Sequence, residues 1–171
     1  MIVKEGSKSN IEPVPEGQHQ AICDLVCDMG IQKTKFGDKH QVYIRFQLPN
    51  LMFEYQGKQK PRVLGLTFTA SLHQKASLRK FVEAWRGKHL TPKQLEGFEM
   101  NDMAGKTAYL QVVHNQVGDD VYANISGVMA LPKEMGQPEL DGEAIVHDEE
   151  TDNSEHLPNW LKEKVGNALP F

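Results

Sequence analysis

The stretch SLHQKASLRKFVEAWRG, Ser71–Gly87, decides the fold because it carries the one long amphipathic helix pattern of the chain. Its large apolar residues recur at the spacing i, i+3, i+4 and i+7, which predicts a helix with one apolar face. These residues are Leu78, Phe81, Val82 and Trp85. Ser71 and Gln74 match a capping box at the start, and Gly87 marks the end. The strands on either side of this helix then set the fold class.

Five segments alternate apolar and polar residues, as half-buried strands do. Three precede the helix and span residues 17–29, 41–48 and 62–70. Two follow it, KTAYLQVVH (106–114) and VYANISGVMAL (121–131), with a hairpin tip, NQVGDD, between them. In the first strand the alternation predicts that five apolar residues share one face, namely Ala21, Cys23, Leu25, Cys27 and Met29.

Three strands, a helix and two strands are the element order of a five-stranded Greek-key barrel, the OB-fold. We therefore expect a mainly β chain in which residues 1–133 form an OB-fold nucleic-acid-binding domain. An SH3-like barrel and an irregular α+β sandwich have similar element orders and are the alternatives. The place of the helix, between strands three and four, favours the OB-fold.

The end of the chain differs in composition from the rest. The segment GQPELDGEAIVHDEETDNSEH, within residues 134–156, holds eight carboxylates, no Lys or Arg and few large apolar residues. This composition predicts an acidic disordered linker. Residues 157–171 are amphipathic again, which predicts a short helix beginning at Pro158.

Charge is divided unevenly along the chain. Its net charge of −4 combines residues 1–133, with 17 basic and 13 acidic residues, and residues 134–171, with 2 and 10. Residues 33–93 alone hold 13 basic and 3 acidic residues. A basic body with an acidic tail predicts a polyanionic partner and a tail that can imitate it. The alternative is a solvated surface followed by a disordered acidic end.

The sequence indicates a protein of a reducing compartment, the cytoplasm of a cell. It contains no long apolar run, and its first residues do not resemble a signal peptide. Cys23 and Cys27 lie four residues apart on one expected strand, where they do not form a disulfide framework. Zinc binding by these cysteines would need distant histidines such as His73 or His89.

Motifs of catalysis are missing from the sequence. It has no Gly-rich phosphate loop, no GxSxG and no HExxH, so we expect no enzymatic activity, no cofactor and no metal. A metal-dependent nuclease would need converging carboxylates, for which the candidates are Asp24, Asp28, Asp119 and Asp120. These residues fall on an outer strand face and a hairpin tip, which does not favour a nuclease.

A binding site is predicted around the stretch KTKFGDKHQVYIRF, Lys33–Phe46, where a phenylalanine lies among lysines. In an OB barrel the outer face of strands two and three and the loops 1–2 and 4–5 bind oligonucleotides. Rings beside cations suit single-stranded nucleic acid, since bases stack on the rings and phosphates pair with the cations. The predicted binding residues are Lys33, Lys35, Phe36, Lys39, Tyr43, Arg45, Arg62, Thr67, Tyr122 and Asn124.

Simpler interpretations exist for several of these residues. Phe36 alternatively packs under its own loop, and Arg45 alternatively pairs with Glu54 across a hairpin. Tyr43 alternatively covers a strand edge. The prediction of a site depends on the convergence of these side chains on one expected face.

Several blocks of the sequence resemble a known family. FGDKHQVYIRFQL, TASLHQKASLRKFVEAWRGK, AGKTAYLQVVHNQ and VYANISGVMALP are similar to bacteriophage-encoded single-stranded DNA-binding proteins with OB-folds. The resemblance covers roughly residues 14–133. It implies coating of single strands during phage DNA replication or recombination in the host cytoplasm. The residues that match are Lys35, Phe36, Lys39, Tyr43, Arg45, Tyr122 and Asn124.

The chain end resembles a second feature of single-strand binders, an acidic stretch closed by Ile-Pro-Phe. This chain closes on Leu-Pro-Phe, which implies a partner-binding tail formed by Trp160, Leu169, Pro170 and Phe171. Here an amphipathic segment separates the acidic residues from the tip, unlike in that pattern. We expect the tail to occupy the binding groove as an autoinhibitor or to dock replication and recombination proteins. The alternative function is a protein-interaction OB module, an adaptor or an inhibitor of a host enzyme.

Overall fold

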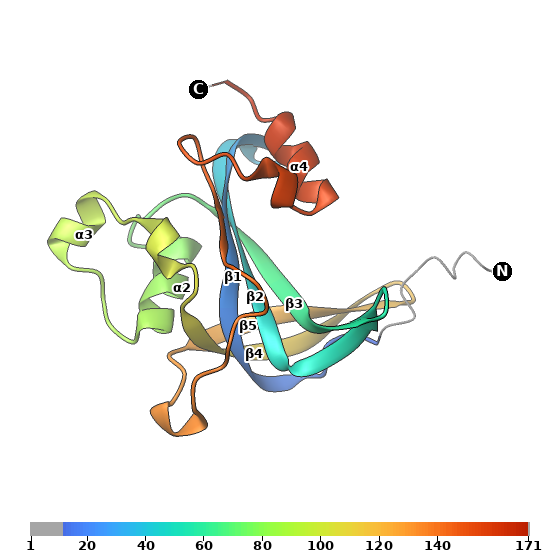
Figure 1. Ribbon diagram of the computed structural model, residues 1–171. Coiled ribbons are helices and arrows are strands. Elements are labelled where there is room, and N and C mark those ends of the chain that lie inside the picture. Colours follow the sequence, from blue (N-terminus) through green and yellow to red (C-terminus); the bar gives the residue numbers. More distant parts are fainter. Residues whose placement is uncertain (1–11, 171) are drawn as a thin grey trace.

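The computed structural model describes residues 12–170 and is mainly β (Figure 1). Five strands form an antiparallel open sheet in the order β3-β2-β1-β4-β5, and a short sixth strand pairs in parallel with β1. The strands are β1 (Gly17–Thr34), β2 (Gly37–Tyr55), β3 (Lys58–Thr69), β4 (Thr107–Val117), β5 (Asp120–Met129) and β6 (Ile145–His147). The helices are α2 (Ser77–Arg86), α3 (Pro92–Glu96) and α4 (Asn159–Gly166), with 3-10 turns η1 (Met100–Met103), η2 (Lys133–Met135) and η3 (Ser154–His156).

Strand β1 is the centre of the sheet because it pairs with three other strands. Its first part, Gly17–Ile22, pairs with β4, and Ile22–Thr34 pairs with β2. The two outer strands of the order, β3 and β5, approach within 8 Å at their Cα atoms. The sheet is therefore strongly curved, and it encloses a main hydrophobic core.

Helix α2 fills that core from one side of the sheet. Leu78, Val82 and Trp85 are buried against the strands, and the Trp85 Nε1 donates a hydrogen bond of 2.7 Å to the Thr107 carbonyl oxygen. This confirms the apolar face predicted from the sequence. The predicted capping box is wrong, because the helix begins at Ser77 and the Ser71 hydroxyl accepts instead from the amide of His73.

Two bulges redirect the side chains of β1. The ladder to β2 shifts register between Cys23 and Leu25 and again between Asp28 and Gly30. Cys23 and Val26 point into the main core, whereas Leu25 points into a second cluster on the opposite face. The expectation that Ala21, Cys23, Leu25, Cys27 and Met29 share one face is therefore wrong, since an extra residue inverts the alternation beyond it.

The C-terminal segment is packed against the body, which differs from the disordered linker expected for residues 134–156. Ile145–His147 form β6 along β1. The side chain of Gln47 donates to the Asp141 carbonyl oxygen at 2.9 Å and accepts from the Asp141 amide at 2.8 Å. Composition did not reveal this order because the few apolar residues of the segment are used at specific contacts.

Helix α4 closes the second cluster. Leu157 and Leu161 are buried there with Leu25, Cys27 and Met29, and Leu161 has no exposed surface. In Figure 1 this helix lies at the end of the β1–β2 ladder, away from α2 and α3. None of the helices in residues 12–170 is long and apolar enough to cross a membrane.

Candidate nucleic-acid interface

The β1–β2 hairpin presents Phe36 to solvent. Lys35 and Phe36 form the two-residue tip, and Gly37 follows with a φ of 104°, a conformation that favours glycine. The Thr34 hydroxyl accepts from the Phe36 amide at 3.1 Å and donates to the Gly37 carbonyl oxygen at 2.6 Å. These bonds fix the turn, so the ring stands outward with 78% of its surface exposed.

Cations surround this ring. The Lys35 Nζ lies 5.3 Å from the centroid of the Phe36 ring, a cation–π distance. Lys33 and Lys39 are exposed on the strands that lead to the tip. Asp38, opposite Lys33 in the ladder, is the acidic residue in this set. The tip therefore carries three lysines, one carboxylate and one ring that no core covers.

Tyr43 is not a free stacking platform, which corrects one predicted site residue. Its ring packs edge-on against Trp160 of α4, with centroids 4.9 Å apart, and it lies directly over Gly65 of β3. Burial raises the pKa of its hydroxyl. The contact explains why position 65 is glycine, since a Cβ there would overlap the Tyr43 ring. The sequence placed Tyr43 on the outer face correctly and predicted a helix after Pro158, but it gave no sign that this helix covers Tyr43.

Arg45 is also occupied by the fold and is not free for a phosphate. Its Nε and NH2 each lie 2.9 Å from an oxygen of Asp24, which is 4% exposed. The Gln47 amide nitrogen lies 3.3 Å from the same carboxylate. The alternative pairing of Arg45 with Glu54 is wrong as well. Because the pair is bidentate and largely buried, a phosphate would have to displace the Asp24 carboxylate from the guanidinium and leave it buried without this partner.

The other predicted residues lie on the remaining surface of the sheet. Thr67, Tyr122 and Asn124 are exposed, and Tyr122 retains 51% of its surface. Arg62 is half-buried on β3 opposite Leu48. The Asn124 side chain donates to the Asn115 Oδ1 at 2.6 Å across the β4–β5 hairpin. Tyr122 and Asn124 thus belong to the β4–β5 hairpin, whereas Thr67 pairs with Tyr43 in the β2–β3 ladder.

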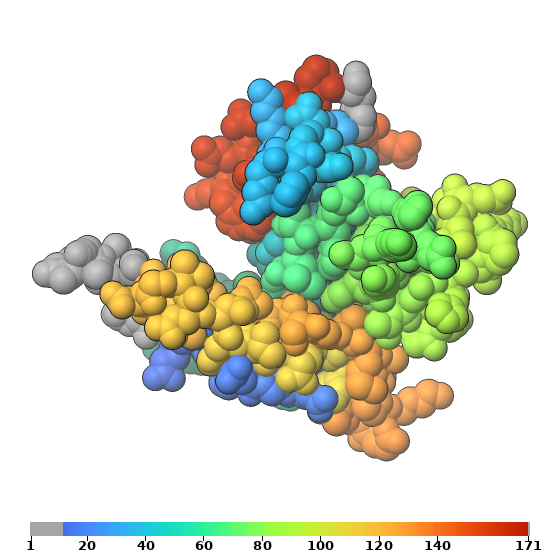
Figure 2. Space-filling model, turned by 180° about the vertical axis from the view of Figure 1, so that it is seen from behind, coloured from blue at the N-terminus to red at the C-terminus, as the bar shows by residue number. Residues whose placement is uncertain are grey.

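A hollow runs between the two hairpins. Figure 2 shows the β1–β2 hairpin, in cyan, above the β4–β5 hairpin, in yellow-orange, with the green surface that begins in β3 between them. Phe36 belongs to the upper hairpin and Tyr122 to the lower one. Both rings are exposed, so each of these hairpins offers one uncovered aromatic side chain.

One group of rings and lysines was not among the predicted binding residues. On the β2–β3 hairpin, Phe53 and Tyr55 lie with ring centroids 6.3 Å apart, beside the paired residues Lys60 and Lys58. This group was detectable, because LMFEYQGKQKP places rings and lysines at alternate positions around a turn. Trp160 of α4 was predicted as part of the partner-binding tail, and it is 45% exposed. Its place beside Tyr43 was not predictable, since it depends on how α4 packs.

The residues predicted for a partner-binding tail are only partly free. Trp160 packs on Tyr43, and the Leu169 amide donates to the Ile31 carbonyl oxygen at 2.9 Å, so both contact the body. Pro170 is exposed, and Phe171 lies outside the described residues. A peptide that projects freely from the acidic segment onward is therefore not what the structure contains.

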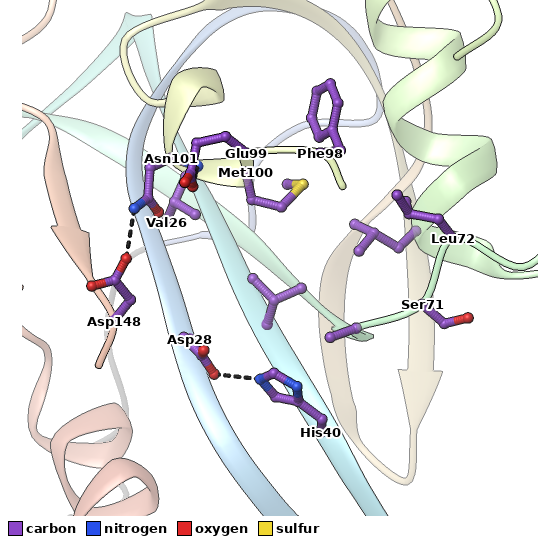
Figure 3. A pocket seen from close by; sticks show the side chains of 13 residues that line it. Val26, Asp28, His40, Ser71, Leu72, Phe98, Glu99, Met100, Asn101 and Asp148 are labelled. Atoms are coloured by element: carbon purple, nitrogen blue, oxygen red, sulfur yellow. Dashed lines mark hydrogen bonds and ion pairs between the residues drawn. The ribbon is translucent and has the colours of Figure 1, made fainter. Parts of the chain in front are cut away.

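A separate pocket of about 250 Å³ lies between β1, β2 and the turns around α2 (Figure 3). Its walls are largely apolar, and its polar groups pair with each other. His40 Nε2 lies 2.6 Å from Asp28 Oδ1, and the Asn101 side chain donates to Asp148 at 2.7 Å. Carboxylates on two walls repel phosphate, so this pocket is not part of the nucleic-acid interface.

The residues considered for metal or nuclease chemistry are dispersed. Asp24 pairs with Arg45, Asp28 with His40, and Asp119 and Asp120 lie at the β4–β5 tip. Within residues 12–170, no group of three or more His, Cys, Asp or Glu side chains is arranged to hold a metal ion. Burial raises the pKa of both free thiols, Cys23 and Cys27, to about 12, so they are poor nucleophiles at neutral pH.

The functional assignment rests on this geometry, because no protein-family model and no curated protein sequence matches the chain. The resemblance of its sequence blocks to phage single-strand binders stays a prediction. What the described residues offer is a curved sheet with an exposed ring and lysines at one hairpin, a second exposed ring at the other, and a hollow between them.

Proposed function

We propose that this chain is a non-enzymatic single-stranded DNA-binding protein built on an OB-fold. The strand order β3-β2-β1-β4-β5, with α2 between β3 and β4, supports the fold, because it is the neighbour order of the five-stranded Greek-key barrel. The gap between β3 and β5 corresponds to the partly open form of that barrel. The proposed ligand path is the hollow between the β1–β2 and β4–β5 hairpins.

The observation that carries the proposal is the exposed Phe36 ring with Lys35 above it. An isolated phenylalanine with 78% exposure adds nothing to packing, and two hydrogen bonds of Thr34 hold its turn in place. Unpaired bases offer flat faces to such a ring, whereas a duplex hides them in its stack. The neighbouring lysines supply the phosphate contacts.

The proposed binding set is smaller than the sequence suggested. Phe36 and Tyr122 stack on bases, and Lys33, Lys35 and Lys39 contact phosphates. Thr67 and Asn124 are exposed residues that we add to this set, whereas Arg62 pairs with the core-facing Leu48 and is left out. Tyr43 and Arg45 support this surface from within the fold. In keeping with the sequence resemblance, the proposed setting is coating of single strands during phage replication or recombination, with partner docking by Pro170 and Phe171 at the end of the chain.

Removing the Phe36 ring is expected to weaken binding to single-stranded DNA without unfolding the protein. Loss of one stacking ring costs roughly 1–3 kcal/mol, which is about a 5- to 150-fold rise in Kd. The measurement is a gel-shift or anisotropy titration of oligo-dT with the native chain and Phe36→Ala, repeated with a duplex of equal length. We expect the native chain to prefer the single strand.

Met135→Ala provides the matched control, because Met135 is also an exposed apolar residue but lies in η2, at the opposite end of the molecule from the β1–β2 hairpin (Figure 1). It should leave Kd unchanged. Equal affinity of the native chain for single strand and duplex, or equal Kd for Phe36→Ala and native protein, would contradict the proposal. Complete indifference to oligonucleotides would favour the protein-interaction module.

Affinity is expected to fall steeply with salt, since each phosphate contact releases bound counterions. For a single strand the slope of log K against log salt is roughly −0.7 per neutralised phosphate. Replacing Lys33, Lys35 and Lys39 together by alanine should therefore flatten the slope by about 2. The measurement is a titration at four or more salt concentrations. An unchanged slope would remove these lysines from the phosphate path.

A further inference from the structure

A groove of about 610 Å³ separates α4 from the end of β1, next to the hairpin that carries Phe36. Trp160, Glu163 and Lys164 of α4 line one side, and Lys33 of β1 lines the other. Leu169 closes one end. The groove therefore contains a large ring and two lysines, and it lies close to the proposed path of the strand. Of the residues that line it, Lys33 already belongs to the proposed binding set, and the others do not.

Helix α4 holds Trp160 at the surface although its neighbour Leu161 has no exposed area. The indole makes an edge-on contact with Tyr43, and 45% of the residue stays exposed. The short helix is already anchored by Leu157 and Leu161 in the second cluster. Packing therefore does not account for a tryptophan at this position.

The backbone contacts that dock α4 also set the positions of Lys33 and Lys164, which line the groove together with Trp160. Lys164 follows Trp160 by four residues, which places both on one side of α4. The Gln32 side chain donates to the Lys164 carbonyl oxygen at 2.8 Å and to the Met29 carbonyl oxygen at 2.7 Å. Gln32 precedes Lys33, so this buried amide fixes the spacing between the two cationic positions.

We propose that this groove binds one nucleotide of the same single strand, with its base stacked on Trp160 and its phosphate between Lys33 and Lys164. The inference rests on the proposed function and extends it, because the C-terminal segment then contributes to the interface. A flat apolar face with flanking cations is the combination that binds an unpaired nucleotide. Glu163 is the acidic neighbour, and it leaves the lined groove with a net positive charge.

The position of α4 excludes the simpler role of a removable cover. Releasing the helix would expose Leu157 and Leu161 together with Leu25, Cys27 and Met29 beneath them. A tail that competes with DNA must leave the binding surface when DNA binds. Helix α4 instead closes a hydrophobic cluster, which its release would expose to water. DNA that binds the native fold therefore meets α4 in place.

The test uses the two tryptophans of the full-length chain as separate probes. Trp85 is 3% exposed in the main core, so a change in emission on addition of oligo-dT reports on Trp160. We expect quenching without a red shift in the native protein and no quenching in Trp160→Phe. Trp160→Ala should raise Kd about 5- to 150-fold, as for the loss of one stacking platform.

Exposed neighbours provide independent variants that do not disturb the fold. Lys164→Ala should weaken binding and reduce the salt slope by about 0.7, whereas Glu163→Gln should tighten binding. An unchanged Kd in Trp160→Ala would overturn the inference and leave the proposed function standing. A red shift on binding would also overturn it, because it would mean that α4 releases Trp160 to water. No binding of oligo-dT by the native chain would instead refute the proposed function, and the inference with it.

Discussion

Arg45→Met is expected to lower the free energy of unfolding by about 3–5 kcal/mol, the usual result of removing one partner from a buried ion pair. Among the side-chain contacts of Asp24 within residues 12–170, the change leaves the Gln47 amide nitrogen at 3.3 Å, while the carboxylate itself is 4% exposed. An unpaired buried carboxylate has a high desolvation cost, so the folded state loses more than the hydrogen bonds themselves. Urea denaturation followed by circular dichroism measures the loss.

The matched control is Lys35→Met, the same loss of charge at an exposed position. It should change the free energy of unfolding by less than about 0.5 kcal/mol while weakening DNA binding. A second variant, Asp24→Asn in the Arg45→Met background, should recover part of the stability because it removes the unpaired charge. If Arg45→Met proves as stable as the native protein yet binds DNA poorly, then Arg45 contacts phosphate and the assignment made here is wrong.

Leu161→Ala is expected to destabilise the protein by about 2–5 kcal/mol, the range for removing a large apolar side chain from a packed core. Leu161 is the fully buried residue of α4, and it packs in the second cluster with Leu25, Cys27 and Met29 of β1. The effect should be visible as a shift of the urea midpoint. It should be larger than that of any change on the exposed side of the same helix.

Lys162→Ala is the control for this variant, since it alters the next residue of α4 on its exposed side. We expect almost no change in stability from it. The DNA affinity of Leu161→Ala separates two models of the C-terminal segment. A loosened autoinhibitory arm would make the protein bind more tightly, whereas loss of a structural part of the interface should weaken binding. Tighter binding would restore the autoinhibition expected from the sequence.

Much of the sheet was predictable because its strands obey local rules. The clean alternation of Val42, Ile44, Phe46 and Leu48 matches their burial in the main core. The apolar face of α2 was predicted from four residues at helical spacing, and three of them, Leu78, Val82 and Trp85, are buried. In each case the side chains that decide the structure lie within a few residues of one another.

The bulges of β1 were not predictable in the same way. Leu25, Val26 and Cys27 are consecutive apolar residues, so the strand places an apolar side chain inward whichever of its two faces is turned toward the main core. Both faces of this part of β1 are apolar because a second hydrophobic cluster covers the face that points away from the main core. That cluster is completed by α4, more than a hundred residues further along the chain, and no local pattern indicates such a pairing.

The same contrast between local patterns and distant contacts applies to the residues of the candidate site. Phe36 and its lysines were found from sequence because a short polar turn leaves a ring no local partner. Tyr43 and Arg45 were misassigned because their partners, Trp160 and Asp24, lie on other elements. Exposure on a strand's outer face is predictable from alternation, whereas coverage by a distant segment is not.

The inversion along β1 also places the two thiols, Cys23 and Cys27, in different parts of the structure, so their alkylation rates report on different opening motions. Cys23 faces the main core, whereas Cys27 lies beneath α4. An alkylating reagent can reach the latter whenever the last helix lifts transiently, but it reaches the former only when the whole sheet comes apart. The ratio of the two modification rates thus separates partial from complete opening, with no label added to the protein.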